Sequence, residues 1–321
     1  MKRQPSEDDA SAKRFPPSLV YRAAKLYYLE DATQAQIAEL IGTSRPTVSR
    51  LLAEARATGI VHVEVRQPTE PGLAELAEAL RGSLGLAAAY VVPSGSGLAL
   101  GPLLEAEVGK ALRAAKLEPG DALLVSSGAT IHAVAQQSLP ELPGILLCPT
   151  VGGIDESEAA YQTNEITRAL AEKVRGTPVL LFAPALPSAE LRGALVDDPA
   201  MQRVERLWKT AKAALLGIGG PPSGRRLIPS LLEPHRQTLA SAVGDICARP
   251  FDAQGRAVPF PGVGRMVAME LTDLARVPHA VAIAKGAEKV LPITAAAHAG
   301  FFNTLVTDSD TAEQILAAHG A

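Results

Sequence analysis

Residues 33–60 read TQAQIAELIGTSRPTVSRLLAEARATGI, and this stretch decides the fold of the amino-terminal part of the chain. Thr33 followed three residues later by Gln36 is the pattern of a capping box, and Gly42 is placed to end the short apolar helix that the box opens. Ser44 then offers a side-chain oxygen that can cap the free amides of another helix. We therefore expect a short helix, a glycine turn and a longer helix.

This spacing is typical of a helix-turn-helix, whose second helix lies in the major groove of DNA. The polar face of the second predicted helix carries hydroxyl and guanidinium groups, which bind base edges and phosphates. The candidate DNA-binding residues are Ser44, Arg45, Thr47, Ser49 and Arg50. A generic three-helix bundle with a polar face is the alternative. The short helix, the glycine turn and the Arg/Ser/Thr face together favour double-stranded operator DNA as a partner.

The flanking segments set the limits of this domain. Apolar residues at helical spacing over 19–29 predict a preceding helix, and the alternating residues 60–65 predict a strand that would form a wing. The following segment, QPTEPG at 67–72, is unsuited to a helix or strand interior and is predicted to be a linker. We expect a disordered tail over residues 1–17 and a DNA-binding domain over 18–66.

Charge and composition are compatible with this interpretation and exclude other classes. The net charge is −3, but residues 1–66 hold 10 Lys and Arg against 8 Asp and Glu, so a weakly basic segment precedes an acidic one. The two cysteines match no metal-ligand spacing, and we expect reduced, buried thiols, with no metal and no cofactor. The longest uncharged stretch, 82–104, is broken by proline and glycine, and no signal peptide is recognisable. We therefore expect a cytoplasmic protein with no membrane partner.

Residues 73–321 alternate continuously apolar runs with helical stretches, which predicts an α/β domain with a doubly wound, mostly parallel sheet. The predicted strands are 89–92, 122–125, 145–148, 179–182, 215–218, 280–284 and 304–306. The predicted helices include 98–115, 164–175, 201–213, 287–299 and 309–318.

Ligands of such sheets bind at the carboxyl ends of the strands. After one predicted strand come Ser126, Ser127, Gly128, Ala129 and Thr130, followed by a helix. Small residues there let amides and hydroxyls surround an anion at the positive end of the helix dipole. The loop lacks the motifs of nucleotide-binding folds. Because strand-to-helix turns also contain Ser and Gly for structural reasons, a plain turn is the alternative.

Other candidate ligand residues lie in later turns. Gly219 belongs to a glycine-rich turn that allows close approach of a ligand, and Asp245 can accept hydrogen bonds from sugar hydroxyls or cap a turn. Lys289 lies in the first turn of a predicted helix, where a cation is unfavourable for stability. An anionic ligand explains this lysine better than solvent exposure does, although an exposed lysine is the alternative.

The sequence resembles the SorC-type, sugar-responsive bacterial transcriptional regulators, which include the deoxyribonucleoside and central glycolytic regulators. The resemblance covers residues 18–320. It is carried by TVSRLL at 47–52 with Ala55, Arg56 and 59–61, by Val151, Gly152 and Gly153 with Gln162 and Asn164, and by Lys289 with NTLVTD at 303–308.

The resemblance implies a regulator whose operator affinity is controlled by a phosphorylated sugar. It also implies an effector domain similar to the sugar-phosphate isomerase and deaminase fold, and assembly as a homo-oligomer, typically a tetramer. By resemblance, Ser127 to Thr130 would bind the phosphate, with Gln162, Asp245 and Lys289 around the sugar. Because a helix-turn-helix normally works as a symmetric pair, we expect the apolar helices 98–115 and 309–318 of the acidic body to carry the contacts between subunits.

Two departures and one alternative limit this interpretation. Members that bind a bisphosphate have an arginine where this chain has Val151, which favours a monophosphate. No lysine lies between Lys116 and Lys173, which excludes a covalent imine from that stretch. The alternative function is a sugar-phosphate isomerase or deaminase with a fused DNA-binding head. Because the turns 126–130 and 217–224 contain no Asp, Glu or His for acid–base chemistry, we expect no enzyme activity.

Overall fold

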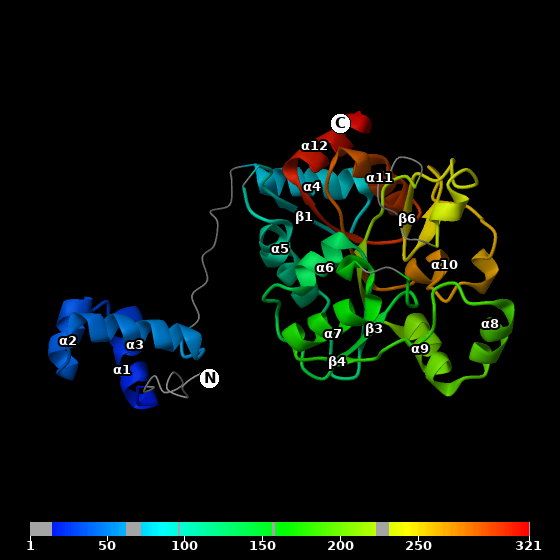
Figure 1. Cartoon of the computed structure of the whole chain (residues 1–321). Coiled ribbons are helices and arrows are strands. Elements are labelled where there is room, and N and C mark those ends of the chain that lie inside the picture. Colours follow the sequence, from blue (N-terminus) through cyan, green and yellow to red (C-terminus); the bar gives the residue numbers. More distant parts are fainter. Residues whose placement is uncertain (1–14, 62–71, 96, 156–157, 223–230, 321) are drawn as a thin grey trace, which may run out of the picture. The chain divides into compact units, whose positions relative to one another are not determined.

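The computed structural model describes residues 15–61, 72–95, 97–155, 158–222 and 231–320 (Figure 1). The chain divides into two compact units, residues 1–68 and 69–321, which we call the head and the body. Within the described residues, no helix is both long and apolar enough to cross a bilayer.

The head is a bundle of three helices, α1 (Pro17–Tyr28), α2 (Gln34–Ile41) and α3 (Arg45–Ala57). Its core is made of apolar side chains at helical spacing from all three helices: Val20, Ala23, Ala24, Ile37, Ala38, Val48, Leu51, Leu52 and Ala55. Helix α1 begins one residue before the predicted domain boundary. Residues 1–14 of the predicted tail, 62–65 of the predicted wing and 67–71 of the predicted linker lie outside the described residues.

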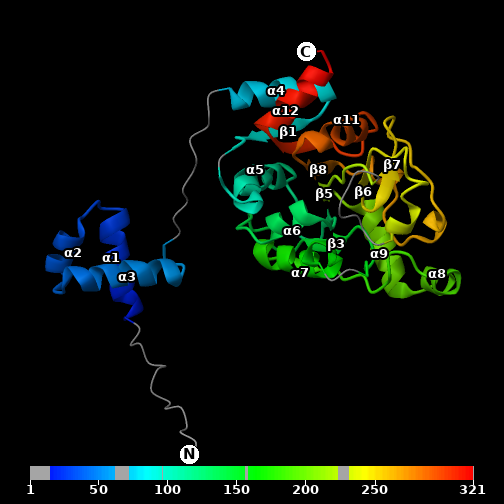
Figure 2. The same cartoon turned by 45° about the horizontal axis from the view of Figure 1, so that its top comes forward.

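The body is built on a parallel sheet of seven strands in the order β1-β9-β8-β5-β2-β3-β4. Figure 2 labels four of them, β1, β8, β5 and β3. The strands are β1 (Ala88–Val92), β2 (Ala122–Val125), β3 (Leu146–Pro149), β4 (Thr177–Pro178), β5 (Ala213–Gly217), β8 (His279–Ile283) and β9 (Thr304–Asp308). The edge strand β1 pairs with β9, in register from Ala88 opposite Thr304 to Val92 opposite Asp308.

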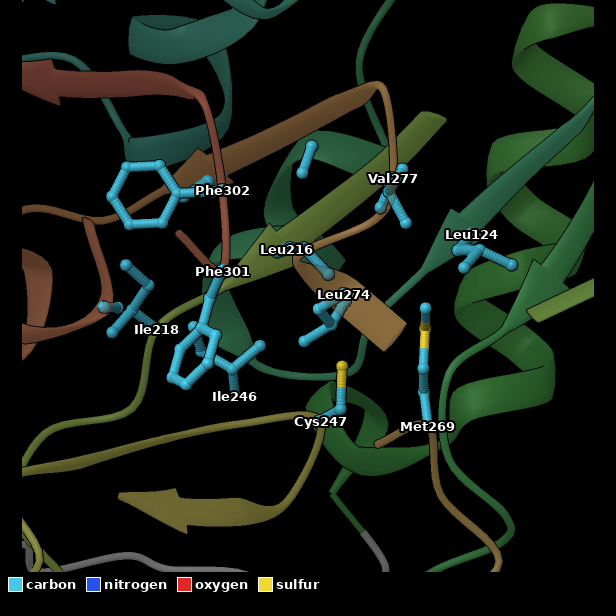
Figure 3. Close-up of a cluster of buried hydrophobic side chains, with 14 of the residues drawn as sticks. Leu124, Leu216, Ile218, Ile246, Cys247, Met269, Leu274, Val277, Phe301 and Phe302 are labelled. Atoms are coloured by element: carbon cyan, nitrogen blue, oxygen red, sulfur yellow. The ribbon is translucent and has the colours of Figure 1, made fainter. Parts of the chain in front are cut away.

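Helices cover both faces of the sheet. Helices α5 (Leu100–Ala114), α6 (Ala129–Ala135) and α7 (Thr163–Val174) pack on one face, and α4 (Leu73–Leu84), α9 (Pro199–Thr210), α11 (Val290–His298) and α12 (Ser309–Ala318) pack on the other. Alternate residues of a strand point to opposite faces, so Leu123 and Val125 join the first core and Leu124 joins the second. Figure 3 shows part of the second core, with Leu124 and Leu216 of the sheet near Phe301 and Met269. The predicted doubly wound α/β body is confirmed.

A smaller sheet of two antiparallel strands, β6 (Gly244–Ile246) and β7 (Arg249–Phe251), lies beside the main sheet. Its two turn residues, Cys247 and Ala248, both have positive φ, 54° and 59°, as in the tight turns of hairpins. Buried Arg249 anchors the hairpin by donating hydrogen bonds to the Ala268 and Met269 carbonyls. The remaining helices are α8 (Ala189–Val196) and α10 (Leu271–Leu274), with 3-10 turns at Ala159–Tyr161, Glu233–His235, Val263–Arg265 and Ala287–Lys289.

Several predicted elements are wrong in their limits. The chain leaves the sheet after Pro178, so the predicted strand 179–182 is irregular, and Phe182 is 83% exposed. The Asn164 amide holds this segment by hydrogen bonds to both the amide and the carbonyl of Leu181. The predicted helix 201–213 ends at Thr210, because Ala213 begins β5. A 3-10 turn replaces the start of the predicted helix 287–299.

Both cysteines are free and buried. Burial raises the pKa of the Cys148 thiol to about 12, and it raises that of Cys247 to about 12. Both thiols are therefore protonated at neutral pH, and the predicted reduced, buried state is confirmed.

Candidate functional site

The turn between α2 and α3 is built by the caps that the sequence predicts. The Thr33 amide donates to the Gln36 side chain at 2.9 Å, and the Gln36 amide donates to Thr33 Oγ1 at 3.4 Å. Gly42 ends α2 in the left-handed region, with φ 68°. Ser44 Oγ accepts the Thr47 amide at 3.4 Å and starts α3. The predicted capping box, glycine stop and serine cap are confirmed.

The structure separates the five candidate DNA-binding residues into two groups. The Ser44 and Thr47 hydroxyls lie 2.9 Å apart and hold the start of α3. Arg45, Ser49 and Arg50 are exposed on the polar face of the same helix. Of the five candidates, these three are exposed within α3 and take no part in its cap, so they stay the side chains predicted to contact DNA.

Further polar groups surround the start of α3. Arg45 borders a hollow of about 630 Å³ that is also lined by Tyr27 and Tyr28 at the end of α1 and by Thr33 and Gln34 at the start of α2. The Arg56 guanidinium donates to the Tyr28 hydroxyl at 3.3 Å, which ties the far part of α3 to α1. The polar surface of the head thus extends beyond α3.

In the body, the candidate effector residues lie where the strand order reverses. After β2 the chain adds β3 and β4 on one side, and after β5 it adds β8 and β9 on the other side. The adjacent carboxyl ends of β2 and β5 are therefore a topological switch point, where ligands of open α/β sheets bind. The loop 126–130 follows β2, and Gly219 follows β5.

Ser126 joins these two loops. It is 2% exposed, its amide donates to the Leu215 carbonyl at 3.0 Å, and its hydroxyl accepts the Gly217 amide at 2.8 Å. Its hydroxyl also lies 3.3 Å from the Ser127 carbonyl. Ser126 therefore fixes the geometry of the switch point from inside the protein.

Gly128 makes the turn into α6. It has φ 119° and ψ 158°, a region that essentially only glycine occupies, and its amide donates to the Ala160 carbonyl at 2.7 Å. Because the Gly128 amide already donates to a carbonyl, it is not a free donor for a phosphate. The predicted phosphate donors are therefore reduced to the other amides and the hydroxyls of 127–130. Ala129 and Thr130 form the first turn of α6, with Ala129 exposed and Thr130 half-buried, as is Ser127.

The hairpin β6–β7 brings Asp245 to the loop after β5. The Gly219 amide donates to the Asp245 carbonyl at 2.8 Å, and the Asp245 amide donates back to Gly219 at 3.4 Å. A β-carbon on neighbouring Gly244 would lie 2.7 Å from the Gly219 carbonyl oxygen, so this close approach requires glycine. Asp245 itself is 7% exposed.

Lys289 approaches the same loop from β8. It ends the 3-10 turn Ala287–Lys289 and directly precedes α11. Its Nζ lies 3.6 Å from the place that a β-carbon on Gly220 would occupy. The lysine ammonium is therefore positioned over the loop that follows β5.

Gln162 lies at the edge of the candidate site. It lies two residues after Ala160, whose carbonyl accepts the Gly128 amide. The Gln162 carbonyl itself accepts the Ile166 amide at 3.0 Å. The structure thus links Ser126 to Gly217, Gly128 to the segment before Gln162, Asp245 to Gly219, and Lys289 to Gly220.

Within the described part of the chain, no group of three His, Cys, Asp or Glu side chains is arranged to hold a metal ion.

Sequence reasoning missed the contacts that hold the turn before Lys289. These contacts come from Lys285, Asp308 and Thr311. One signal in the sequence pointed to this turn: a glycine, Gly128 or Gly286, is the third residue after each of β2 and β8. The repeated spacing indicates that the two turns have the same backbone geometry.

Comparisons with known proteins agree with this arrangement. Residues 70–317 match the family model of a sugar-binding domain, and residues 23–77 match that of a Crp-like helix-turn-helix domain. The sorbitol operon regulator of Klebsiella pneumoniae is 31% identical over 309 residues, covering 93% of this chain and 97% of the relative. The deoxyribonucleoside regulator of Bacillus subtilis is 32% identical over 304 residues, with coverage of 93% and 97%.

Solved structures show the same architecture. The full-length sorbitol operon regulator SorC from Klebsiella pneumoniae superposes with a TM-score of 0.74 at 29% identity, covering 93% of this chain and 98% of that one. A DeoR family transcriptional regulator from Listeria monocytogenes has a TM-score of 0.65 at 28% identity, covering 76% and 99%. The relatives are named as transcriptional regulators, which indicates a regulator and not an enzyme. The chain belongs to the SorC-type family of sugar-binding transcriptional regulators.

Proposed function

We propose that a phosphorylated sugar binds at the carboxyl ends of β2, β5 and β8 and controls the affinity of the head for operator DNA. The observation that carries this proposal is the position of the Lys289 ammonium over Gly220, at the topological switch point. The relatives named for the sorbitol operon and for deoxyribonucleosides support a sugar or a sugar derivative as the ligand class.

The chemistry of the site favours one phosphate group. The first-turn amides of α6 and the Thr130 hydroxyl would supply neutral donors, and Lys289 would supply a charge-assisted one. Gln162 and Asp245 would bind sugar hydroxyls. Val151 is fully buried in an apolar cluster, so the position where bisphosphate binders have an arginine supplies no second cation. A sugar monophosphate therefore fits best.

Titration calorimetry tests the ligand class. We expect pentose 5-phosphates or hexose 6-phosphates to bind, and each corresponding free sugar to bind much more weakly. Lys289→Ala is expected to weaken binding by about ten- to a hundredfold, because charge-assisted hydrogen bonds contribute about 1.5–3 kcal/mol. Thr130→Ala is expected to weaken it less.

The control is Lys209→Ala, because Lys209 is an exposed lysine in the last turn of α9. The control is expected to bind like the wild type. Equal affinity for a sugar and its phosphate, or wild-type affinity in Lys289→Ala, would show that the phosphate site lies elsewhere.

The regulatory step is tested separately. Operator affinity measured by fluorescence anisotropy is expected to change when the sugar phosphate saturates the body, by a coupling of about 1–3 kcal/mol. Operator DNA must change the ligand affinity by the same factor, because coupling is reciprocal. Lys289→Ala is expected to bind operator DNA normally without ligand. Unchanged operator affinity at saturating ligand would contradict control by this site.

We further propose a homo-oligomer, with the tetramer as the expected form, since helix-turn-helix proteins read operators as symmetric pairs. We keep α5 and α12 as the helices expected to carry the contacts, through the residues that remain at the surface, because their apolar faces pack into the body's own core. Leu104, Leu112 and Ile315 are each 0% exposed. Sedimentation is expected to show dimers or tetramers, and a monomer that binds operator DNA alone would contradict the assembly.

A further inference from the structure

The start of α12 holds the turn that carries Lys289. The Thr311 hydroxyl accepts the Gly286 amide at 2.8 Å. Three residues earlier, at the end of β9, Asp308 forms an ion pair with Lys285, whose Nζ lies 3.0 Å from Asp308 Oδ2. Consecutive residues of the turn, 285 and 286, are thus attached to one helix end.

Asp308 and Thr311 also hold each other. Asp308 Oδ1 accepts the Thr311 amide at 3.1 Å and caps α12. Burial alone raises the pKa of the Asp308 carboxyl, but the hydrogen bonds from Thr311 and Lys285 outweigh burial and hold this pKa below its ordinary value. Asp308 is therefore ionised at neutral pH and keeps both partners in place.

These contacts fix the path of the chain up to Lys289. Gly286 has φ 114° and ψ 149°, which matches Gly128 in the other turn, and its carbonyl accepts the Lys289 amide at 2.9 Å. Gly286 therefore connects the two residues: its amide donates to the Thr311 hydroxyl, and its carbonyl accepts the Lys289 amide. Thr311 is 1% exposed and Gly286 is half-buried, so the hydrogen bond between them is largely shielded from solvent.

We propose that Thr311, with Asp308, is a positioning residue that sets the Lys289 ammonium opposite Gly220 for the phosphate of the ligand. This inference rests on the proposed function. Neither residue needs to touch the ligand, because each acts through the 285–289 turn. Loss of the Thr311 hydroxyl should loosen the turn and make Lys289 a poorer phosphate ligand.

The test compares three threonine variants of the full chain. Thr311→Val removes the hydroxyl while keeping the volume, and Thr311→Ser keeps the hydroxyl. The matched control is Thr307→Val on β9, since the buried Thr307 hydroxyl has no hydrogen-bond partner among the described residues. Lys285→Gln removes the ion pair to Asp308 and provides a second route to the same loosening.

Ligand affinity is measured by calorimetry with glucose 6-phosphate, ribose 5-phosphate and inorganic phosphate as probes. We expect Thr311→Val to raise the Kd of the probes that the wild type binds by about five- to tenfold, the size of one lost hydrogen bond. Thr311→Ser and Thr307→Val are expected to stay within about twofold. Lys285→Gln is expected to act in the same direction with a smaller effect, because Lys285 is 34% exposed.

Hydrogen exchange of the unliganded chain gives the second readout. Exchange of the amides at 285–289 is expected to accelerate by about tenfold or more in Thr311→Val and to stay unchanged in Thr307→Val. Unchanged exchange in Thr311→Val overturns the inference whatever the ligand. Faster exchange with wild-type affinity also overturns it. A wild type that binds none of the probes contradicts the proposed function, and the exchange data still decide whether Thr311 holds the turn.

Discussion

Helix α3 of the head and the candidate ligand turns of the body present polar groups in different ways. In the head, caps reach only three residues along the chain, as from Thr33 to Gln36 and from Ser44 to Thr47, and Arg45 and Arg50 point outward. In the body, the turns are held over long distances, with Ser126 and Gly217 separated by 91 positions. Substitutions of the outward side chains of α3 should therefore change affinity alone, whereas substitutions in the body turns should change affinity and stability together.

Two glycine substitutions test this difference most strongly. A β-carbon at Gly128 or at Gly42 would meet no described atom within 4 Å, so any effect comes from backbone conformation. Gly128→Ala should destabilise the body by roughly 2–3 kcal/mol, because its φ of 119° with ψ 158° suits essentially only glycine. Gly42→Ala should destabilise the head by about 1 kcal/mol, because left-handed helical geometry is milder for alanine.

Urea titration can assign each loss to its unit. The chain has one tryptophan, Trp208, which is buried in the body and donates to the Pro149 carbonyl at 2.8 Å. Its fluorescence should report a lower midpoint for Gly128→Ala and an unchanged one for Gly42→Ala, while circular dichroism should register both. If both substitutions lowered the free energy of unfolding equally, the proposed difference between head and body would be wrong.

Arg50→Ala should change DNA affinity without changing stability. If Arg50 binds a base edge, operator affinity should fall by about 1–3 kcal/mol while random DNA is little affected. If it binds phosphate, both should weaken and the salt dependence should become shallower. Anisotropy on a fragment of the protein's own promoter region measures this, with exposed Arg206 of α9 changed to alanine as the control. Wild-type affinity for both DNAs would show that α3 is not the reading helix.

The smallest effect is expected at the two body cysteines. Because burial raises the pKa of the Cys148 and Cys247 thiols to about 12, neither should react with iodoacetamide in the native state at neutral pH. Mass spectrometry should find both alkylated only in denaturant. Labelling of either cysteine in the native chain would show that the body opens enough to expose its core to the reagent. The contrast with the exposed side chains of the head would then be lost.

The sequence predicts the head more fully than the body for the same reason. Capping boxes, serine caps and glycine stops are local patterns, so Thr33, Gly42 and Ser44 could be recognised from their neighbours alone. The body's apolar runs predict its parallel sheet well, but run length does not tell where a strand ends. The segment 179–182 is apolar without being a strand, because Asn164 takes up the backbone groups of Leu181 that a neighbouring strand would otherwise bind.

The residues of the candidate site could be predicted from the sequence, but the hydrogen bonds that connect its loops could not. Ser126 to Thr130 and Lys289 stand out by residue type and by resemblance. The bond from the Gly128 amide to the Ala160 carbonyl has no signature, because every residue carries a carbonyl. The hairpin that carries Asp245 was likewise hidden, because Cys247 and Ala248 occupy turn positions where asparagine and glycine are the usual signal.

The pairing of β1 with β9 has a consequence for how the chain is made. Strand β1 has β9 as its neighbour in the sheet, joining Ala88 to Thr304 across most of the sequence. Among the described residues of the head, side-chain hydrogen bonds span at most 39 positions, so the head can fold as soon as it leaves the ribosome. This edge of the body must wait until residues 304–308 have been synthesised. Nascent chains therefore carry a DNA-binding head before they carry a finished effector domain. A premature stop before β9 should yield a folded head on a body that has lost its sheet edge.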